Sequence, residues 1–564
     1  MGLDRKTAAR TLRDIAQLTE LNGGNPHRVR AFANAARAVE RIDGDLAGLV
    51  ASGAILEVAG IGKGTAAVLA ELAAGREPEA LAELARATPP GVRELLEVAG
   101  LGPKRARTLW QELAVTSVGE LEYACRENRL LGLAGFGPAS QQKLLEALRF
   151  HQSSRARRLV HQAAAAAEEV VEKLAAAPGV EQVEVAGELR RGCETVAALD
   201  LVVVADREQA GRALSSILAD VVPMPGGWLG SDRDGLPVRV WTTDPARAAW
   251  TLVEATGSAA HVAALRGRAV AAGLQIDDGR LRSGRNPAAI AGERELYAAL
   301  GCQWVAPELR EDGSEVEAAA AHRLPELVSI ADLRGALHNH TSDSDGVASV
   351  AEMARAAGEL GWQLLGIADH SPAAHYANGL SADRLRAQWR VIDELNAAGG
   401  PRLVKGIEAD ILPDGRLDVP AGCEDGLEYV VASIHSSFRL AAEAQTERVL
   451  AAVRHPATRV LGHPTGRLLL ARPGYEIDLE QVLAACAECG VAVEINASPY
   501  RLDLDAAWAR RAIELGVRLA VNPDAHEPAG LADVRWGVTV VRRAGAEARH
   551  LVNCGDIEGW LARS

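Results

Sequence analysis

Histidines and carboxylates recur from residue 335 onward at the places where apolar strands are expected to end. The full set is His338, His340, Asp345, Asp369, His370, Glu408, His435, His463, Asp524 and His526. Imidazole and carboxylate together favour Mn, Zn or Fe, and bridging carboxylates can gather two or three ions. Such clusters make hydroxide near neutral pH and hold the oxygens of a phosphate ester during in-line attack. The pattern predicts a metal-dependent phosphoesterase site.

The elements that must position these residues form a regular series. An apolar strand, a polar cluster and a helix alternate about seven times, with strands expected near GALH, LLGIAD, LVKGIEAD, YVVASIH, RVLGHP, VAVEIN and RLAVNPDAH. This alternation predicts a parallel α/β barrel, in which the C-terminal strand ends share one face. A single histidine is more often a satisfied core or surface residue, but the repetition favours a metal centre.

Three short repeats stand in the helical first 150 residues: VAGIGKGTA (58–66), VAGLGPKRA (98–106) and LAGFGPASQ (133–141). Each places glycine, an apolar residue and glycine before a helix start, which exposes backbone N–H groups beside a positive helix end. We expect helix-hairpin-helix units that bind the DNA backbone rather than units of simple helical packing. The candidate contacts are Gly60, Gly62, Lys63, Gly100, Gly102, Lys104, Arg105, Gly135 and Gly137. Ala139 replaces Lys104 in the third repeat, which predicts a weaker contact there.

Composition limits the class of protein. A chain of 564 residues suggests several domains, and the net charge of −14 argues against DNA binding through a broad positive field. Residues 1–150 are nearly neutral, with 19 Lys and Arg against 18 Asp and Glu, so the acidic excess lies downstream. No apolar run is long enough for a membrane span or signal peptide, which predicts a cytoplasmic protein without a membrane partner.

The middle of the chain outlines a nucleotidyl-transfer site. Residues 155–330 predict a small α+β domain, in which the long helix RARRLVHQAAAAAEEVVEKLAAA precedes the strands VEQVEVAG, LDLVVVAD and LPVRVWTT, with a helix between the last two. The stretch VAGELRRGCETVAALDLVVVAD (185–206) has an apolar strand, a glycine turn, paired arginines and a second strand with Asp200. Ala198 stands where a second carboxylate would alternate with Asp200 to hold a metal.

The C-terminal motifs LHNHTSDSDG, IADHS, GIEADIL, VASIHSSF, GHPTGRLL and PDAH closely resemble the polymerase and histidinol phosphatase (PHP) domain over residues 335–564. The resemblance implies a distorted seven-stranded barrel with a trinuclear centre. Its ligands would be His338, His340, Asp345, His370, Glu408 as the bridge, His435, His463, Asp524 and His526. The family's acidic residue before the first histidine is Ala336 here. Arg467 would contact the substrate phosphate or form a structural salt bridge.

The whole chain resembles a bacterial family X DNA polymerase, through GNPHRVRAFANAARAVE, TGSAAH (256–261), LGCQWVAPELRE and LPELVSIADLRG. The resemblance implies a helical DNA-binding domain (1–85), a fingers-like domain with two hairpins (86–152), a nucleotidyltransferase-like palm (153–255), a thumb (256–315), a linker (316–334) and the PHP domain (335–564).

The family's polymerase site is degenerate in this chain. Its first aspartate is Ala198, its second is Asp200, and its third is replaced by Arg239. The phosphate-binding Gly-Ser turn reads Gly187-Glu188, and Arg190 and Arg191 could serve as salt bridges. One carboxylate cannot assemble a two-metal site, so we expect polymerase activity to be lost. Asp206, Asp232 and Asp234 lack the spacing to replace the missing aspartates.

The family's lyase activity is also doubtful here. It needs a lysine amine on the helix after the first hairpin, and Val68 occupies that place, while Lys63 lies in the turn.

The expected protein is a monomeric DNA-repair enzyme, a metal-dependent 3′→5′ exonuclease or 3′-end phosphoesterase. It would use three Mn, Zn or Fe ions and act on gapped, nicked or 3′-end DNA. The alternatives are an active gap-filling polymerase with proofreading, a non-catalytic DNA-end scaffold and a small-molecule phosphatase.

Overall fold

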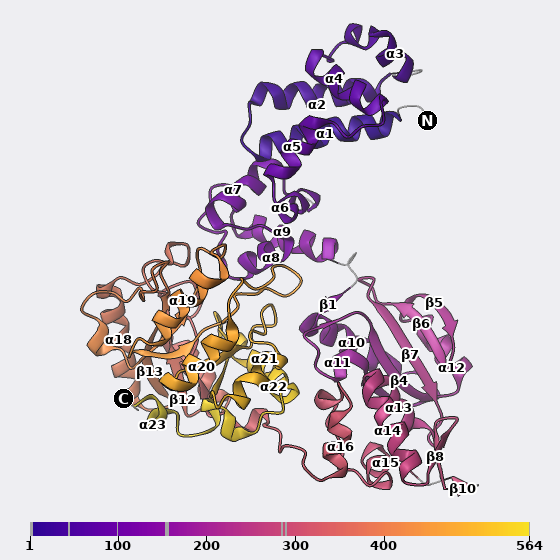
Figure 1. Cartoon of the computed structure of the whole chain (residues 1–564), viewed down its shortest axis with the longest axis vertical. Helices are drawn as coiled ribbons and strands as arrows, with labels where there is room; N and C mark the ends of the chain where they lie inside the picture. Colours follow the sequence, from indigo (N-terminus) through magenta and orange to yellow (C-terminus); the bar gives the residue numbers. More distant parts are fainter. Residues whose placement is uncertain are drawn as a thin grey trace. The chain divides into compact units, whose positions relative to one another are not determined.

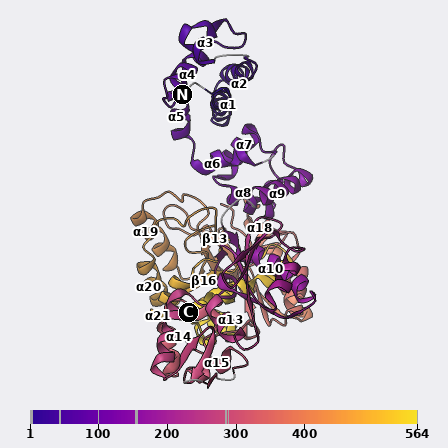
Figure 2. The same ribbon diagram turned by 90° about the vertical axis from the view of Figure 1, so that its right-hand side faces the viewer.

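A computed structural model describes residues 4–42, 46–98, 100–152, 157–283, 286–287 and 290–562. The chain divides into two compact units, residues 1–152 and 153–564 (Figures 1 and 2). Among the described helices, none has the length and apolar character needed to cross a membrane.

The first unit is helical throughout its described residues. Its α-helices are α1 (Arg5–Leu21), α2 (Pro26–Glu40), α3 (Leu46–Ser52), α4 (Lys63–Ala73), α5 (Glu79–Ala87), α6 (Pro90–Glu94), α7 (Pro103–Leu113), α8 (Val118–Arg126) and α9 (Pro138–Gln152), with 3-10 turns at Ala54–Glu57 and Leu95–Glu97. Two apolar cores form, one around α1, α2 and α4 and one around α7, α8 and α9. Leu81 and Leu84 of α5 pack against both cores and join them.

The second unit begins with a mixed sheet. Its order is β2 (Val180–Ala186), β4 (Leu199–Ala205), β7 (Pro237–Thr243), β6 (Gly227–Ser231) and β5 (Ala219–Met224), in which only β4 and β7 are parallel. The helix α12 (Arg207–Leu214) lies between β4 and β5 in the chain, as predicted. The β5–β6 hairpin was not predicted from the sequence.

The long helix predicted from residue 155 is shorter in the structure. The helix α10 spans Val160–Ala175, and the preceding Arg158–Leu159 form β1, which pairs with β3 (Thr195–Val196). Residues 153–156 lie outside the described residues. Because alanine-rich sequence favours a helix at any position, only pairing with the distant β3 sets the helix start. The helix packs Ala163, Ala167 and Val170 against the apolar face of β4.

A second group of helices follows the mixed sheet. It comprises α13 (Ala248–Thr256), α14 (Ala259–Ala271), α15 (Glu293–Ala299) and α16 (Ser314–Ala320), the strands β8 (Gln275–Asp277), β9 (Arg280–Ser283) and β10 (Asn286–Pro287), and a 3-10 turn at Pro307–Leu309. The short helix α11 (Gly187–Arg190) lies in the palm turn. The predicted linker begins with most of α16, whose Val316 and Ala319 belong to this core.

The C-terminal strands form a parallel seven-stranded sheet in chain order: β11 (Gly335–Ala336), β12 (Leu364–Ile367), β13 (Arg402–Asp410), β14 (Tyr429–Ser433), β15 (Thr458–Leu461), β16 (Ala492–Asn496) and β17 (Leu519–Asn522). A parallel bridge between Asn339 and Ala525 joins the ends of the first and last strands, so the barrel is nearly closed. This confirms the predicted barrel and its strands.

Helices surround this barrel (Figure 1). They are α17 (Val350–Glu359), α18 (Ala382–Ala398), α19 (Ala442–Val453), α20 (Leu479–Cys489), α21 (Ala506–Glu514), α22 (Val534–Arg543) and α23 (Ile557–Leu561), with 3-10 turns at Ile330–Asp332, His375–Ala377, Glu424–Gly426, Pro528–Asp533, Ala548–His550 and Val552–Cys554. Residues of β14, β16 and β17 are buried on both faces, which explains their continuous apolar sequence.

Candidate metal centre

The nine predicted ligands converge at the C-terminal ends of the barrel strands. His338, His340 and Asp345 follow β11, His370 follows β12, Glu408 lies near the end of β13, His435 follows β14, His463 follows β15, and Asp524 and His526 follow β17. Parallel strands place these ends at one face because all seven run in the same direction. Residues far apart along the chain are therefore neighbours; for example, His340 Nε2 lies 3.1 Å from Asp524 Oδ1, 184 positions later in the chain.

Glu408 stands at the centre of the cluster. Its Oε1 lies 3.3 Å from His338 Nε2, 3.2 Å from His435 Nε2 and 3.0 Å from His463 Nε2. Its Oε2 lies 2.9 Å from His370 Nδ1. A carboxylate whose two oxygens face different imidazoles has the geometry of a bridging ligand.

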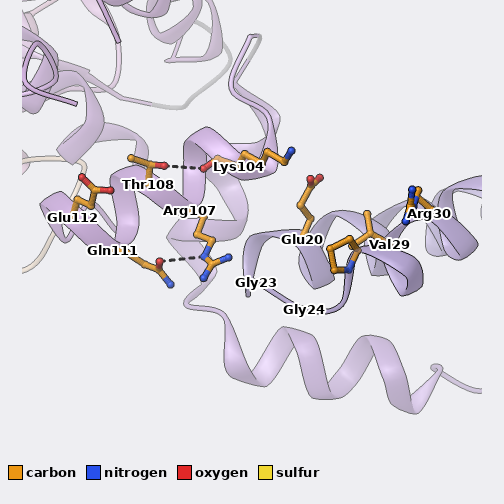
Figure 3. A pocket seen from close by; sticks show the side chains of 11 residues that line it. Glu20, Gly23, Gly24, Val29, Arg30, Lys104, Arg107, Thr108, Gln111 and Glu112 are labelled. Carbon is orange, nitrogen blue, oxygen red and sulfur yellow. Dashed lines mark hydrogen bonds between the residues drawn. The ribbon is translucent and has the colours of Figure 1, made fainter. Parts of the chain in front are cut away.

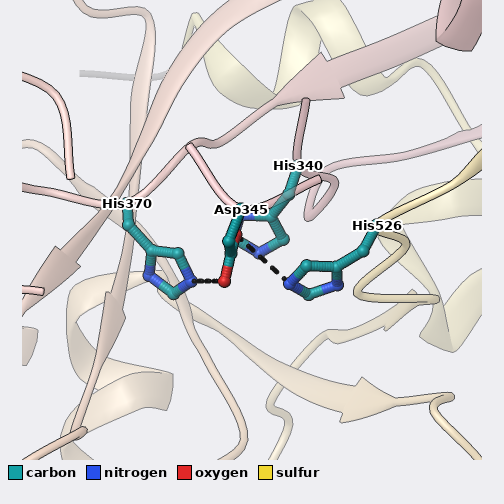
Figure 4. Close-up of side chains that lie close together, drawn as sticks. All are labelled: His340, Asp345, His370 and His526. Atoms are coloured by element: carbon teal, nitrogen blue, oxygen red, sulfur yellow. Dashed lines mark ion pairs between the residues drawn. The ribbon is translucent and has the colours of Figure 1, made fainter. Parts of the chain in front are cut away.

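Asp345 organises a second part of the cluster (Figure 4). It lies 3.8 Å from His340 Nδ1, 3.4 Å from His370 Nε2 and 3.4 Å from His526 Nε2. Three groups each bring one ligand atom per residue within 4.8 Å of one another: His340, Asp345, His370 and His526; His338, His340 and Asp524; and His370, Glu408 and His435.

Several buried ring nitrogens of the cluster fit a bound cation. Within the described residues, His338 Nε2, His340 Nδ1, His370 Nδ1 and His463 Nδ1 are buried and make no hydrogen bond of good geometry, although Glu408 oxygens lie 3.3 Å from His338 Nε2 and 2.9 Å from His370 Nδ1. A buried polar atom without a partner is costly, and a metal ion would satisfy it. The donor set of imidazole and carboxylate therefore suits divalent metal ions.

The electrostatics of the cluster also favour a cation. Burial would lower the pKa of His338, but Glu494, Glu408 and Asp524 outweigh burial and raise it well above its usual value. Burial would raise the pKa of Glu408, yet the surrounding imidazoles, foremost His435, hold it well below its usual range. The carboxylates thus attract positive charge at the positions where metal ions would bind.

Two acidic residues outside the predicted set contact ligand rings, and a third, Asp369, holds the chain next to His340. Glu494 Oε1 lies 2.8 Å from His338 Nδ1, and Asp410 Oδ1 lies 2.5 Å from His435 Nδ1. Asp369 was noted in the sequence pattern but was not predicted to be a ligand. It accepts hydrogen bonds from the Thr341 N–H at 2.7 Å and the Gln388 side chain at 2.5 Å. The contacts of Glu494 and Asp410 fix the ring orientation of His338 and His435. In the sequence, Glu494 and Asp410 could have been noticed as acidic residues within otherwise apolar strands, as in VAVEIN.

At the position expected for the polymerase site, Asp200 and Arg239 form an ion pair. Asp200 on β4 lies directly across from Arg239 on β7, and the guanidinium contacts both carboxylate oxygens at 2.7 Å. Gly187 has a positive φ of 62°, and a Cβ there would lie 2.1 Å from Asp200 Oδ2. Ala198 is buried beside the start of β4. The carboxylate of Asp200 is thus already paired with the guanidinium of Arg239.

The turn residues of this site are also occupied. Glu188 accepts hydrogen bonds from the Arg157 side chain at 2.9 Å and the Ala197 N–H at 2.8 Å. Arg190 makes two hydrogen bonds of 2.8 Å to Glu293. Arg191 donates to Glu311 at 3.2 Å. Both arginines form the salt bridges that the sequence allowed.

The alternative carboxylates serve local structure. Asp206 caps α12 by accepting from the N–H groups of Glu208 and Gln209. Asp232 accepts from the N–H groups of Asp234 and Leu236 in the turn between β6 and β7. These contacts give neither residue a place beside Asp200.

The three hairpin turns of the first unit open helices as predicted. Gly62, Gly102 and Gly137 immediately precede α4, α7 and α9. The earlier glycines, Gly60, Gly100 and Gly135, have φ values of 97°, 82° and 84°. A Cβ at Gly62, Gly102 or Gly137 would meet no described atom within 4 Å. The space in front of these turns is therefore open to close approach by a ligand backbone.

The basic residues of the hairpins differ in their surroundings. Arg105 packs its guanidinium 4.3 Å from the Phe136 ring centre and donates to Gly100 O, so it joins two hairpins. Lys104 lies with Arg30 and Arg107 along a groove of about 630 Å³ between α7 and the α1–α2 turn (Figure 3). Lys63 begins α4, while Val68 is buried on that helix.

The structure places Arg467 in a structural contact. Its Nη2 donates to Glu194 Oε1 at 2.8 Å and its Nε donates to Arg501 O at 3.1 Å. Of the two predicted roles, this geometry supports the salt bridge.

Comparisons with known proteins agree with this architecture. Family models match as a helix-hairpin-helix domain (residues 4–77), a SAM-like helix-hairpin-helix tandem (92–149), a DNA polymerase beta thumb (251–311) and a PHP domain (336–498). A probable phosphatase of Thermoanaerobacter sp. (strain X514) is 32% identical over 243 residues, covering 40% of this chain and 92% of that protein. Another from Caldanaerobacter subterraneus subsp. tengcongensis is 32% identical over 206 residues, covering 34% and 74%.

The DNA polymerase/3′-5′ exonuclease PolX of Bacillus subtilis (strain 168) is 35% identical over 582 residues, covering 100% of both chains. The similarity extends through the hairpins, the thumb and the barrel. The chain therefore belongs to the bacterial family X DNA polymerases that carry a C-terminal PHP domain.

Proposed function

We propose that this chain is a metal-dependent DNA 3′→5′ exonuclease or 3′-end phosphoesterase that acts through its PHP domain, and that it has lost polymerase activity. The observation that carries the proposal is the convergence of six imidazoles and three carboxylates around Glu408. The names of the similar proteins, an exonuclease and phosphatases, support chemistry at a phosphate ester.

The nine predicted ligands would hold divalent ions, which we propose are three in number and Mn, Zn or Fe. Bound ions supply Lewis acidity and lower the pKa of water, which suits hydrolysis of a phosphodiester. Glu408 would bridge ions, while Glu494 and Asp410 hold the rings of His338 and His435 in place. The protein's own part is to fix these groups before substrate arrives, so that little reorganisation accompanies the reaction.

The hairpin turns support DNA as the substrate. Their glycines leave open space at the helix starts, where a phosphate backbone can approach closely and be bound without any base being read. We propose that the hairpins hold gapped, nicked or 3′-end DNA and that the enzyme acts as a monomer. Lys63 and Lys104 would contribute point charges to the contact.

Two features support the loss of polymerisation. Arg239 contacts both oxygens of Asp200, and its positive charge opposes a second cation there. Glu188 places a carboxylate where the family's serine would meet a triphosphate, and contacts from Arg157 and Ala197 keep the pKa of this carboxyl below its usual value despite burial. Both features weaken binding of metal and nucleotide.

The test measures 3′ degradation and primer extension side by side on DNA with a one-nucleotide gap and Mn. We expect the unaltered protein to release a 3′-terminal label without extending the primer. The double variant His338→Ala/His340→Ala should release none, whereas His455→Ala, an exposed histidine of the same domain, should be unaffected. Undiminished release by the double variant would contradict the proposed site, and primer extension would contradict the proposed loss of polymerisation.

A small phosphate ester is the second candidate substrate, because probable phosphatases match the barrel alone. Turnover of a nucleotide monophosphate that exceeds turnover of DNA would favour this alternative. Binding of DNA without cleavage, by protein purified without metal, would instead favour a scaffold.

A further inference from the structure

The loop that carries His463 is held by the palm as well as by the barrel. Arg467, on this loop, is 16% exposed, and its Nη2 donates to Glu194 Oε1 at 2.8 Å. Glu194 is 17% exposed and lies in the turn between α11 and β3 of the degenerate polymerase site. A side chain of the palm thus contacts a side chain of the loop that carries His463.

Within the barrel, Arg467 joins two loops. Its Nε donates to Arg501 O at 3.1 Å, and its Nη2 also donates to Leu502 O. The next residue, Asp503, accepts from the Thr465 N–H at 3.0 Å and from the Thr465 hydroxyl at 2.9 Å. Arg467 and Asp503 therefore hold the loop after β15 against the loop after β16.

Both loops lead directly to predicted metal ligands. Thr465 is two residues beyond His463 in the chain. Asn496 donates its N–H to Asp503 O at 2.6 Å and its side-chain amide to Asp524 Oδ2 at 2.9 Å. A displacement of Arg467 would therefore be transmitted to His463 on one side and Asp524 on the other.

We propose that Glu194 is a positioning residue for the PHP metal centre, and that the palm turn supports hydrolysis in place of nucleotide transfer. The inference rests on the proposed function. Without Glu194, the partly buried guanidinium of Arg467 loses its closest carboxylate. An unpaired buried charge is costly, so we expect the Arg467 side chain to move toward another carboxylate. The remaining carboxylates are Asp505, at 3.7 Å, and Asp503, which is needed by Thr465.

A second ion pair at the same boundary provides a matched control. Arg542 on α22 donates to Glu308 at 2.7 Å and to Val328 O at 2.8 Å. These contacts also join the barrel to the preceding helices, yet they involve neither the loop after β15 nor the loop after β16. Loss of Glu308 therefore loosens the boundary without moving Arg467.

The experiment compares Glu194→Ala, Glu194→Gln, Arg467→Ala, the double variant Glu194→Ala/Arg467→Ala, and Glu308→Ala in the full chain. We expect Glu194→Ala to lower kcat for release of a 3′ label about tenfold with an unchanged KM for DNA, because Glu194 acts through Arg467 and touches no DNA. Glu194→Gln should recover part of the rate since its amide oxygen still accepts. The double variant should be no slower than Arg467→Ala, and Glu308→Ala should keep the full rate.

Unchanged kcat in Glu194→Ala, equal losses in Glu194→Ala and Glu308→Ala, or losses that multiply in the double variant would each overturn the inference. Retention of Mn by the purified variants gives a readout that does not depend on catalysis. If the unaltered protein cleaves neither DNA nor a small ester, the proposed function fails. The inference then stands only if Glu194→Ala, and not Glu308→Ala, weakens Mn retention.

Discussion

The contact between Arg190, Glu293 and Arg310 allows a quantitative prediction for the joint between palm and thumb. Glu293 is 8% exposed and receives two hydrogen bonds from Arg190 at 2.8 Å, and Arg310, fully buried, lies 2.6 Å away. Burial alone would raise the pKa of Glu293, but these two arginines outweigh it and lower the pKa from 4.5 to about 2. A carboxyl shifted in this way contributes about 3 kcal/mol to the free energy of unfolding at pH 7.

The perturbation is Glu293→Gln, which keeps the shape of the side chain and removes its charge. We expect the free energy of unfolding to fall by about 3 kcal/mol at pH 7, since two guanidinium groups lose their shared anion. In urea this corresponds to a midpoint lower by about 1 M or less, because the denaturant slope of a chain this long is at or above the roughly 3 kcal/mol/M reached by small proteins. Tryptophan fluorescence can follow unfolding, because Trp250 and Trp304 belong to the same core.

The shifted pKa also predicts how the stabilising effect of Glu293 changes with pH. The folded-state pKa is depressed, so the unfolded chain binds more protons between about pH 2 and 4.5, and stability falls as pH falls through this range. The difference between the unaltered protein and Glu293→Gln should therefore be full above pH 5 and shrink toward pH 3. Glu317→Gln, an exposed change on the neighbouring helix α16, should alter stability by less than about 0.5 kcal/mol. A difference in unfolding free energy between the unaltered protein and Glu293→Gln that is absent at pH 7, or that stays constant from pH 5 to pH 3, would refute the reasoning.

Three further predictions concern the metal centre, the closed polymerase site and the DNA interface. Glu408→Gln should reduce the Mn bound per chain, measured by elemental analysis, and lower 3′ release by at least about 100-fold, because the bridging charge is lost; full metal content would contradict the bridge. Arg239→Ala should leave primer extension undetectable, because Asp200 would remain a single carboxylate. The same change should lower the free energy of unfolding, measured in urea, by about 1–3 kcal/mol. Any gain of primer extension would disprove the proposed loss of polymerase activity. Lys63→Ala/Lys104→Ala should weaken DNA binding, measured by fluorescence anisotropy, equally for unrelated DNA sequences. It should also reduce the slope of log K against log salt by up to about 2. A loss of affinity that depends on the DNA sequence would be inconsistent with backbone contacts.

The barrel was predictable because its signal is repeated and local. Each strand is mainly apolar, and a metal-binding residue type follows at the same place in nearly every repeat. Strand direction alone then brings His338, Glu408 and Asp524 to one face, without knowledge of any side-chain contact. The hairpin turns were predictable for a similar reason, since glycine and the helix start lie within a few residues.

Other features depended on residues that are far apart in the chain. The sequence showed Arg239 in place of an aspartate, but only the register of β4 and β7 places its guanidinium on Asp200. The start of α10 was mispredicted because β1 exists only through pairing with β3.

The amino-acid sequence by itself therefore indicated the barrel through its periodicity and residue types, and it indicated the family and the nine candidate ligands through the resemblance of its motifs. The tertiary structure decided which groups support those ligands and which arginines are already paired. Glu494 and Asp410 read as ordinary strand residues until their neighbours are known, and Arg467 allowed two roles until Glu194 was placed beside it. The physical reason is that a charged side chain in a folded protein takes its role from the opposite charge nearest in space, which sequence distance does not reveal.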